Sequence, residues 1–170
     1  ELLHELHEAA VAFLQSPPKG YALPGLRPGR MAWTLPFEQL WASVAEQLIA
    51  ALRPALGAML GGEPSIEHAE VLVAWAGHGE SQEWHQDHPD RHPQLDERFG
   101  TRVHILGGWM PLQPVGPRSG PLCMRTTGPR GESYELDVGP QLELGDIVFY
   151  DMSMYHRGKA NHEDHDRIVL

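Results

Sequence analysis

Two histidines and an aspartate lie at spacings that suit a metal site. His85 and Asp87 are separated by one residue, and His156 follows far along the chain. Residues two apart on a strand point to the same face, so the first pair would present an imidazole and a carboxylate together. His156 would come from a strand that is distant in sequence and adjacent in space. Two imidazoles and one carboxylate on one face of a metal leave the opposite positions open, as in non-heme Fe(II) sites.

A candidate anion-binding residue, Arg167, follows His156 by eleven positions. The intervening residues 157–166 are polar and poor in apolar side chains, which predicts a loop between two strands. Such a hairpin would bring Arg167 close to His156. A guanidinium stays charged when buried and pairs with a carboxylate through two hydrogen bonds. The pattern therefore suggests a dicarboxylate that chelates the metal at one end and meets Arg167 at the other.

The second half of the chain, from about residue 71 to 170, resembles the phytanoyl-CoA dioxygenase-like branch of the Fe(II)/2-oxoglutarate-dependent oxygenases. An ordered set of motifs carries the resemblance. These are residues 84–87, 107–113, 119–122 and 145–150, followed by His156, Asn161 and Arg167.

The resemblance implies Fe(II) held by His85, Asp87 and His156. It also implies hydroxylation of a small organic substrate by O2, with 2-oxoglutarate converted to succinate and CO2. The iron and the cosubstrate carry that chemistry, while the protein orients and shields it. Related halogenases have Gly or Ala at the position of Asp87, so the carboxylate favours hydroxylation.

Three residues are expected to contact the cosubstrate: Arg167, Gln82 and Trp109. The chain departs from the family at two places. Residues 123–129 replace a Pro-Gly-Ser/Thr-His stretch, and Arg157-Gly158 replaces the Gly-Ser that often follows the distal histidine, which removes a hydroxyl partner for the cosubstrate.

Composition narrows the class of protein. The 170 residues correspond to one domain, and the net charge of -10 argues against a nucleic-acid partner. Cys123 is the only cysteine, so an intramolecular disulfide is excluded and a reducing compartment, the cytoplasm, is expected. No apolar run approaches the roughly 20 residues of a membrane span. The sequence does not specify an oligomeric state.

Periodicity predicts a mainly β, α+β fold. Helices are expected over 1–15 and from Pro36 to residue 60, with Pro54 kinking or splitting the second one. Residues 1–62 would form a helical N-terminal support with one short strand at 31–33. Residues 63–170 would form a double-stranded β-helix, or cupin-like jelly roll, truncated at its C-terminal end. The expected strands are 70–75, 101–113, 121–126, 141–144, 147–150 and the segment from 167.

Two other functions fit parts of the pattern. A cupin-type metalloenzyme that does not use 2-oxoglutarate would share the metal ligands without needing Arg167. A non-catalytic jelly roll that binds a metal or ligand would have no need of a complete ligand set. Several side chains keep two interpretations. His88, His92, His162 and His165 suit solvated loops better than ligand contacts, Trp75, Trp84 and Trp109 suit packing or a pocket, and Gln113 and Asn161 suit either a structural or a binding role.

Overall fold

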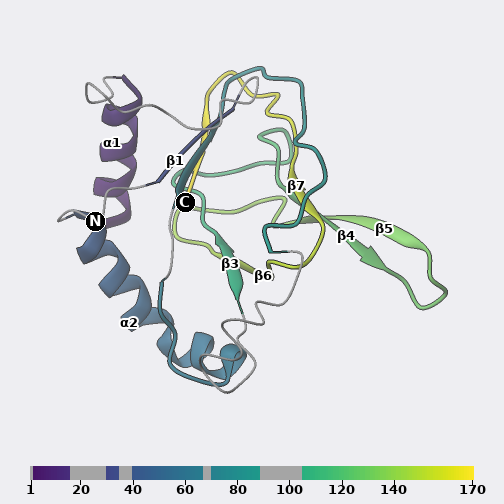
Figure 1. The fold of residues 1–170 in the computed structure, drawn as a ribbon. Coiled ribbons are helices and arrows are strands. Elements are labelled where there is room, and N and C mark those ends of the chain that lie inside the picture. The colour runs from purple at the N-terminus through teal and green to yellow at the C-terminus, as the bar shows by residue number, and fades with distance from the viewer. Residues whose placement is uncertain (1, 16–29, 35–39, 67–69, 89–104) are drawn as a thin grey trace.

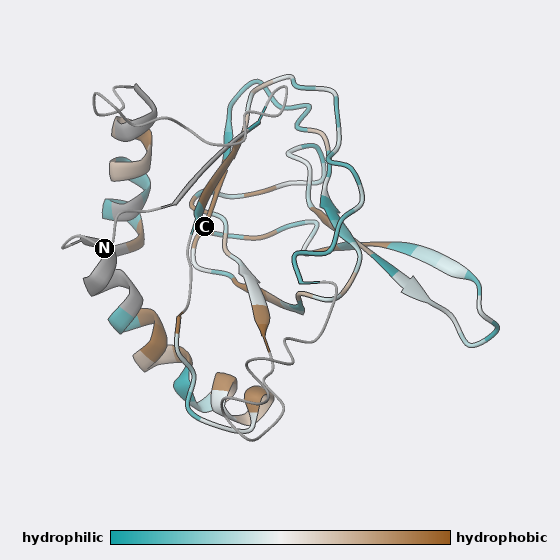
Figure 2. Cartoon of the chain, in the orientation of Figure 1, coloured by the Kyte–Doolittle hydropathy of each residue, from teal (hydrophilic) through white to brown (hydrophobic). Residues whose placement is uncertain are grey.

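The computed structural model describes residues 2–15, 30–34, 40–66, 70–88 and 105–170. Its two helices, α1 (Leu2–Gln15) and α2 (Leu40–Leu60), lie along one side of a body made of strands (Figure 1). Both helices were predicted from the apolar periodicity. Figure 2 shows hydrophobic residues alternating with hydrophilic ones along α2, as expected of a helix with one face against the strands. No helix in these ranges is long and apolar enough to cross a membrane.

Of the two outcomes predicted at Pro54, a kink or a split of the second helix, the split does not occur. α2 continues through this residue as one helix of 21 residues. A proline removes one backbone donor and crowds the preceding turn, and the burial of Leu56 against the strands helps to offset that cost. The helix is followed by Gly61, which has a φ of 71° and donates its N–H to the carbonyl of Gly57 at 2.9 Å, a common helix ending.

One side of the body is a sheet of antiparallel strands. Its first three strands are, in spatial order, β1 (Arg30–Thr34), β2 (Glu70–Ala74) and β8 (Arg167–Val169). The pair formed by β3 (Leu106–Trp109) and β6 (Val148–Asp151) adjoins β8, because Met110 and Leu170 exchange two backbone hydrogen bonds of 2.8 Å. Because β1 belongs to this sheet, residues 1–62 contribute a strand and are not only a helical support.

The second sheet faces the first and has the order β5-β4-β7. Its strands are β4 (Leu122–Thr127), β5 (Ser133–Val138) and β7 (His156–Gly158). The β4–β5 hairpin projects away from the body (Figure 1), and its tip is hydrophilic (Figure 2). β5 was not predicted, because its exposed outer half mixes charged and aromatic residues without a clear apolar face.

The strand expected at 141–144 is absent. This segment makes one isolated bridge, between Val115 and Leu142. The Asp146 carboxylate accepts a hydrogen bond from the N–H of Glu143 at 2.8 Å, and Gly145 has a φ of 98°. A side chain that bonds its neighbouring backbone competes with strand pairing, so the segment forms a turn.

Apolar side chains from both sheets form the core between them. The buried cluster consists of Trp109, Val115, Leu122, Met124 and Val169. Two antiparallel sheets facing each other across such a core form a double-stranded β-helix, or jelly roll, with the N-terminal helices on one side. The predicted fold class is confirmed.

Candidate metal centre

His85 and His156 lie side by side although they are far apart in sequence. Each donates its backbone N–H to the carbonyl of the other, at 3.1 and 2.9 Å, which forms an isolated antiparallel bridge. His156 begins β7, as predicted. The expectation of a strand at His85–Asp87 was wrong, because only His85 is paired there, in a single bridge, and the chain bends at Asp87 and His88.

The three predicted ligands converge. The Nε2 atom of His85 lies 3.7 Å from Oδ1 of Asp87, and the Nε2 atom of His156 lies 3.3 Å from Oδ2. One ligand atom from each residue lies within 4.8 Å of the other two. Ligands that share an ion at about 2.0–2.2 Å lie at such separations from one another. The group is therefore a geometrically suitable site for one divalent metal ion.

Both imidazoles are held by their other ring nitrogen. Nδ1 of His85 donates to the carbonyl of Glu83 at 2.8 Å, and Nδ1 of His156 donates to the carbonyl of Met154 at 2.9 Å. A carbonyl can only accept, so each Nδ1 carries a proton and Nε2 is the atom free to coordinate a metal in the neutral ring. The rings are fixed in the orientation that a metal requires.

The charges in the site support one another. The hydrogen bond with His156 is the main cause that lowers the pKa of Asp87 below its ordinary value, although partial burial opposes it. Burial disfavours the charged form of His156, but its hydrogen bonds with Asp87 and Met154 outweigh that effect and raise its pKa. The carboxylate is therefore ionised at neutral pH, as a metal ligand must be.

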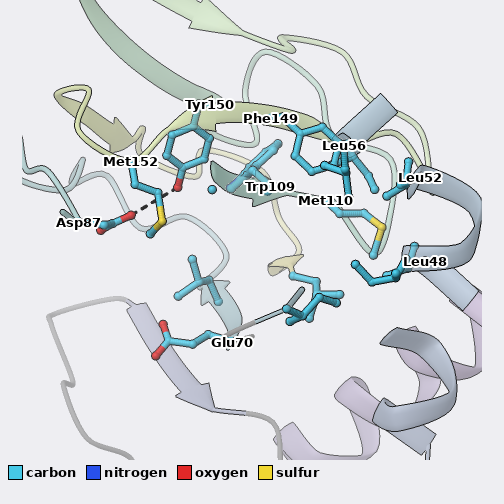
Figure 3. A pocket seen from close by; sticks show the side chains of 17 residues that line it. Leu48, Leu52, Leu56, Glu70, Asp87, Trp109, Met110, Phe149, Tyr150 and Met152 are labelled. Atoms are coloured by element: carbon cyan, nitrogen blue, oxygen red, sulfur yellow. Dashed lines mark hydrogen bonds between the residues drawn. The ribbon is translucent and has the colours of Figure 1, made fainter. Parts of the chain in front are cut away.

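Tyr150 contacts this group and was missed in the sequence. Its hydroxyl points at Oδ2 of Asp87 at 3.5 Å (Figure 3). Its ring centre lies 4.8 Å from that of His156. Burial and the neighbouring carboxylate raise the pKa of the Tyr150 hydroxyl, so it stays protonated and can donate. The available signal was its strand, in which Tyr150 shares a face with Val148, and the structure pairs Tyr150 with Gly107 across the β3–β6 ladder.

A cavity of about 270 Å³ begins at Asp87 and Tyr150 and extends toward α2. Figure 3 shows its lining, which is mainly apolar. Leu48, Leu52 and Leu56 of α2 gather at one end of the cavity beside Met110 and Phe149, while Asp87, Tyr150 and Met152 lie toward the other end. Trp109 also lines the cavity and is buried in the core, so the expected pocket and packing roles are combined in this residue.

Arg167, the first residue of β8, is almost fully buried. Only 3% of the residue is exposed, and its Nη1 atom donates to the carbonyl of Ser119 at 3.1 Å. Its buried Nε has no hydrogen-bond partner within the described ranges, and the guanidinium carbon lies 5.8 Å from the ring centre of Trp109. Burial, and secondly the charge of Arg30, lower the pKa of Arg167 to about 9. It is a cation at neutral pH with unused donor capacity.

Gln82 makes a backbone contact in place of the expected free amide. Its Oε1 accepts from the N–H of Gly158 at 2.7 Å, and its own N–H donates to the Gly158 carbonyl at 2.9 Å. Gly158 in turn has no room for a Cβ, which would stand 2.7 Å from Nη1 of Arg30 and 3.3 Å from Nη2 of Arg167. Gln82 thus fixes the strand end beside Arg167.

The remaining candidates have structural roles or lie outside the described residues. Asn161 is buried and donates to the carbonyls of Ala74 and His165, so it ties the loop before β8 to β2. Trp84 lies between the guanidinium groups of Arg125 and Arg157, at 4.3 and 4.4 Å. Gln113 donates to the Asp166 carbonyl. Trp75, His162 and His165 are exposed, His88 is half-buried, and His92 lies outside the described residues.

Neither a protein-family model nor a curated protein sequence matches the chain. Several solved structures share its fold. One is SnoN, described as a non-heme alpha ketoglutarate dependent epimerase from nogalamycin biosynthesis. The TM-score is 0.71 at 18% identity, covering 99% of this chain and 70% of SnoN.

Two further solved structures are similar. EctD from S. alaskensis, solved with 2-oxoglutarate and 5-hydroxyectoine, has a TM-score of 0.67 at 18% identity, covering 99% of this chain and 65% of EctD. EvdMO1 has a TM-score of 0.68 at 14% identity. The match covers 99% of this chain and 43% of EvdMO1, so this chain spans less than half the length of that protein. At these identities the likeness establishes the shared fold.

Proposed function

We propose that the protein is an Fe(II)- and 2-oxoglutarate-dependent dioxygenase that hydroxylates a small organic molecule. The observation that carries the proposal is the convergence of His85, Asp87 and His156, with both Nδ1 atoms already engaged by carbonyls. Two imidazoles and one carboxylate suit Fe(II) and leave coordination positions for other ligands. Solved proteins of the same fold described as alpha ketoglutarate dependent support the same class of chemistry.

The residues fit the cosubstrate as well as the metal. Arg167 is a buried cation whose Nε has no hydrogen-bond partner among the described residues, and its guanidinium lies beside Gly158, two residues from His156. A 2-oxoglutarate molecule would use its keto acid end on the metal and its distal carboxylate on Arg167, since a guanidinium pairs with both carboxylate oxygens. A cupin-type enzyme without this cosubstrate would leave Arg167 without such a role.

Bound iron and 2-oxoglutarate would supply the oxidation, in which one atom of O2 enters the substrate C–H bond and the other enters succinate as CO2 is lost. Each Nδ1–H of His85 and His156 is fixed by a carbonyl, so the ring orientation is set and Nε2 is the atom that would coordinate the ion once its proton is released. Tyr150 donates toward Asp87 and holds its carboxylate in one orientation. Trp109 lines the cavity and lies 5.8 Å from the buried guanidinium of Arg167, and burial there strengthens the electrostatic interactions of Arg167.

Metal titration tests the assignment of the ligands. Wild-type protein should bind one Mn(II) ion tightly, and Asp87→Ala should weaken that binding strongly, because one of three protein ligands is lost. Asp164→Ala is the matched control, since its side chain is 99% exposed and lies in the loop before β8. Equal Mn(II) affinity in Asp87→Ala and wild type would remove the assignment.

The products test the reaction itself. The Fe(II)-loaded protein with O2 should convert 2-oxoglutarate to succinate, and a screen of small molecules should find one that accelerates succinate formation and gains one oxygen atom. SnoN shows that the fold is not restricted to hydroxylation, since it is described as an epimerase. A chlorinated or stereochemically inverted product, or substrate oxidation without 2-oxoglutarate consumption, would contradict the proposal.

A further inference from the structure

A second buried arginine lies in the same cross-strand row as Arg167. In the β1-β2-β8 sheet, Arg30 is paired with Ala74, and Ala74 is paired with Arg167. Residues directly opposite one another in neighbouring strands point to the same face of the sheet. Both arginines therefore project from one face, on either side of a residue whose side chain is a single methyl group.

The two long side chains converge over the end of β7. Nη1 of Arg30 and Nη2 of Arg167 lie 2.7 and 3.3 Å from the point where a Cβ of residue 158 would stand. Nη2 of Arg30 donates to the carbonyls of Gly158 and Lys159, at 2.8 and 2.6 Å, and Nη1 of Arg167 lies 3.5 Å from the latter. Gly158 leaves open the space in which the two guanidinium groups meet.

This space belongs to the interior of the metal site. Residues 156 and 158 alternate with Arg157 on β7, so position 158 faces the same side as the ligand His156. The two guanidinium groups thus lie beside Gly158, which is two residues along β7 from the candidate ligand His156. Their planes could be bridged by one carboxylate, whose two oxygens accept from two separate donors.

Two buried cations this close repel each other, and an anion between them relieves that repulsion. Arg30 and Arg167 are 9% and 3% exposed. Arg167 donates to backbone carbonyls, which are neutral, and its Nε has no hydrogen-bond partner among the residues that the structure describes. The charge of Arg30 contributes to the lowered pKa of Arg167, which is the electrostatic sign of their proximity.

We propose that Arg30 is a second cosubstrate-binding residue, which shares the distal carboxylate of 2-oxoglutarate with Arg167. The inference rests on the proposed function. Arg167 alone recognises a carboxylate, whereas the pair places a double positive charge at the far end of the site. The site would therefore select a keto acid with a second carboxylate over one of the same length that ends in a methyl group.

Two keto acids of equal length test the inference. Dissociation constants for 2-oxoglutarate and for 2-oxopentanoate, which has a methyl group in place of the distal carboxylate, are measured on Mn(II)-loaded protein by calorimetry. The variants are Arg30→Gln and Arg30→Lys. Arg53→Gln is the control, because it also removes one positive charge but lies exposed on α2. Mn(II) affinity and thermal unfolding are recorded for each.

Arg30→Gln should weaken 2-oxoglutarate binding by about tenfold or more, since hydrogen bonds to charged groups are strong. Its affinity for 2-oxopentanoate should change by no more than about twofold. Arg30→Lys should retain part of the preference for the dicarboxylate, and it gives the same comparison if Arg30→Gln does not fold. Arg53→Gln should match wild type with both ligands.

The other outcomes overturn the inference in distinct ways. Equal weakening of both keto acids would make Arg30 a structural residue that holds the carbonyls of Gly158 and Lys159. No change with either ligand would show that the carboxylate does not reach Arg30. If wild-type protein binds Mn(II) but does not distinguish the two keto acids, the cosubstrate assignment itself fails, and with it the proposed function.

Discussion

Gly107 lies directly opposite Tyr150 across the β3–β6 ladder, and a Cβ at position 107 would stand 2.7 Å from Cε1 of the tyrosine ring. The absence of a side chain on β3 is thus what allows the ring to lie flat across it and to direct its hydroxyl at Asp87. Core packing in one strand and the orientation of a candidate metal ligand are coupled through this pair.

Gly107→Ala should displace the Tyr150 ring and destabilise the protein by about 1–3 kcal/mol, the usual cost of overpacking. Mn(II) affinity should also fall, because Asp87 loses its hydroxyl neighbour. Gly108→Ala is the control, since its Cβ would meet Phe149 at 3.4 Å, close to ordinary contact. Chemical denaturation and Mn(II) titration measure both effects. The loss of stability should be smaller in a Tyr150→Ala background, and an equal loss in both backgrounds would rule out the coupling.

Metal binding should depend on pH through His156. A protonated imidazole cannot coordinate a metal, and hydrogen bonds with Asp87 raise the pKa of His156 against the effect of burial. Mn(II) affinity should therefore fall as the pH drops below a value higher than the ordinary 6.5, with release of a proton on binding. Calorimetry in buffers of different ionisation enthalpy counts that proton. An affinity that stays constant from pH 8 to about 6 would contradict the raised pKa.

When no metal is bound, the interaction between His156 and Asp87 should instead contribute to the stability of the fold. The raised pKa of His156 stabilises the fold at low pH, and this contribution is lost as the pH rises through the folded value. The lowered pKa of Asp87 contributes above its ordinary value of 3.8, and this is lost as the pH falls through the folded value. The pair should thus contribute most to stability in the mildly acidic range. Thermal unfolding of metal-free wild type and His156→Gln across pH should differ most there.

Arg167→Lys should weaken the binding of 2-oxoglutarate although it conserves the charge. Lysine lacks the planar guanidinium that donates to both carboxylate oxygens. A loss of about 1.5–3 kcal/mol corresponds to an affinity about 10- to 100-fold lower. Mn(II) binding should barely change, because Arg167 is not a candidate ligand. A parallel fall in both affinities would indicate a structural role, and no fall in either would mean that a dicarboxylate binds elsewhere.

Asn161→Ala should destabilise the protein by about 1–3 kcal/mol, because it leaves the carbonyls of Ala74 and His165 without their donor. Asn161 is 1% exposed, so water cannot replace the amide easily. The neighbouring His162→Ala is the control, since that side chain is exposed. Denaturant unfolding measures the difference. Equal stability of the two variants would show that the loop does not depend on this amide.

The residues that carry chemistry were more predictable than the elements that hold them. His85, Asp87 and His156 were recognisable from residue type and order, and their Nε2 and carboxylate atoms do converge. The strand around His85 was not, because its pairing reduces to one bridge with a residue 71 positions away, which no local pattern reports. Local patterns also failed at β5 and at 141–144, where exposure and a carboxylate-capped turn override the apolar alternation.

Arg30 shows a different limit of sequence reasoning. In sequence it stands among glycines and prolines, before a short expected strand, and nothing near it suggests a binding role. Only the register of β1 with β2, and of β2 with β8, brings it into line with Arg167. Long-range register is set by the packing of whole sheets, so a residue whose importance depends on it cannot be identified from its neighbours in the chain.

The reciprocal backbone hydrogen bonds between His85 and His156 have a consequence for how the site acquires its ion. A metal that gathers ligands from distant parts of a chain commonly has to close the loop between them, and the lost entropy weakens its binding. Here hydrogen bonds between peptide groups, which need no ion, close that loop. When an ion binds, it exchanges its water molecules for side chains that are already in position. One ion can therefore replace another without the protein refolding.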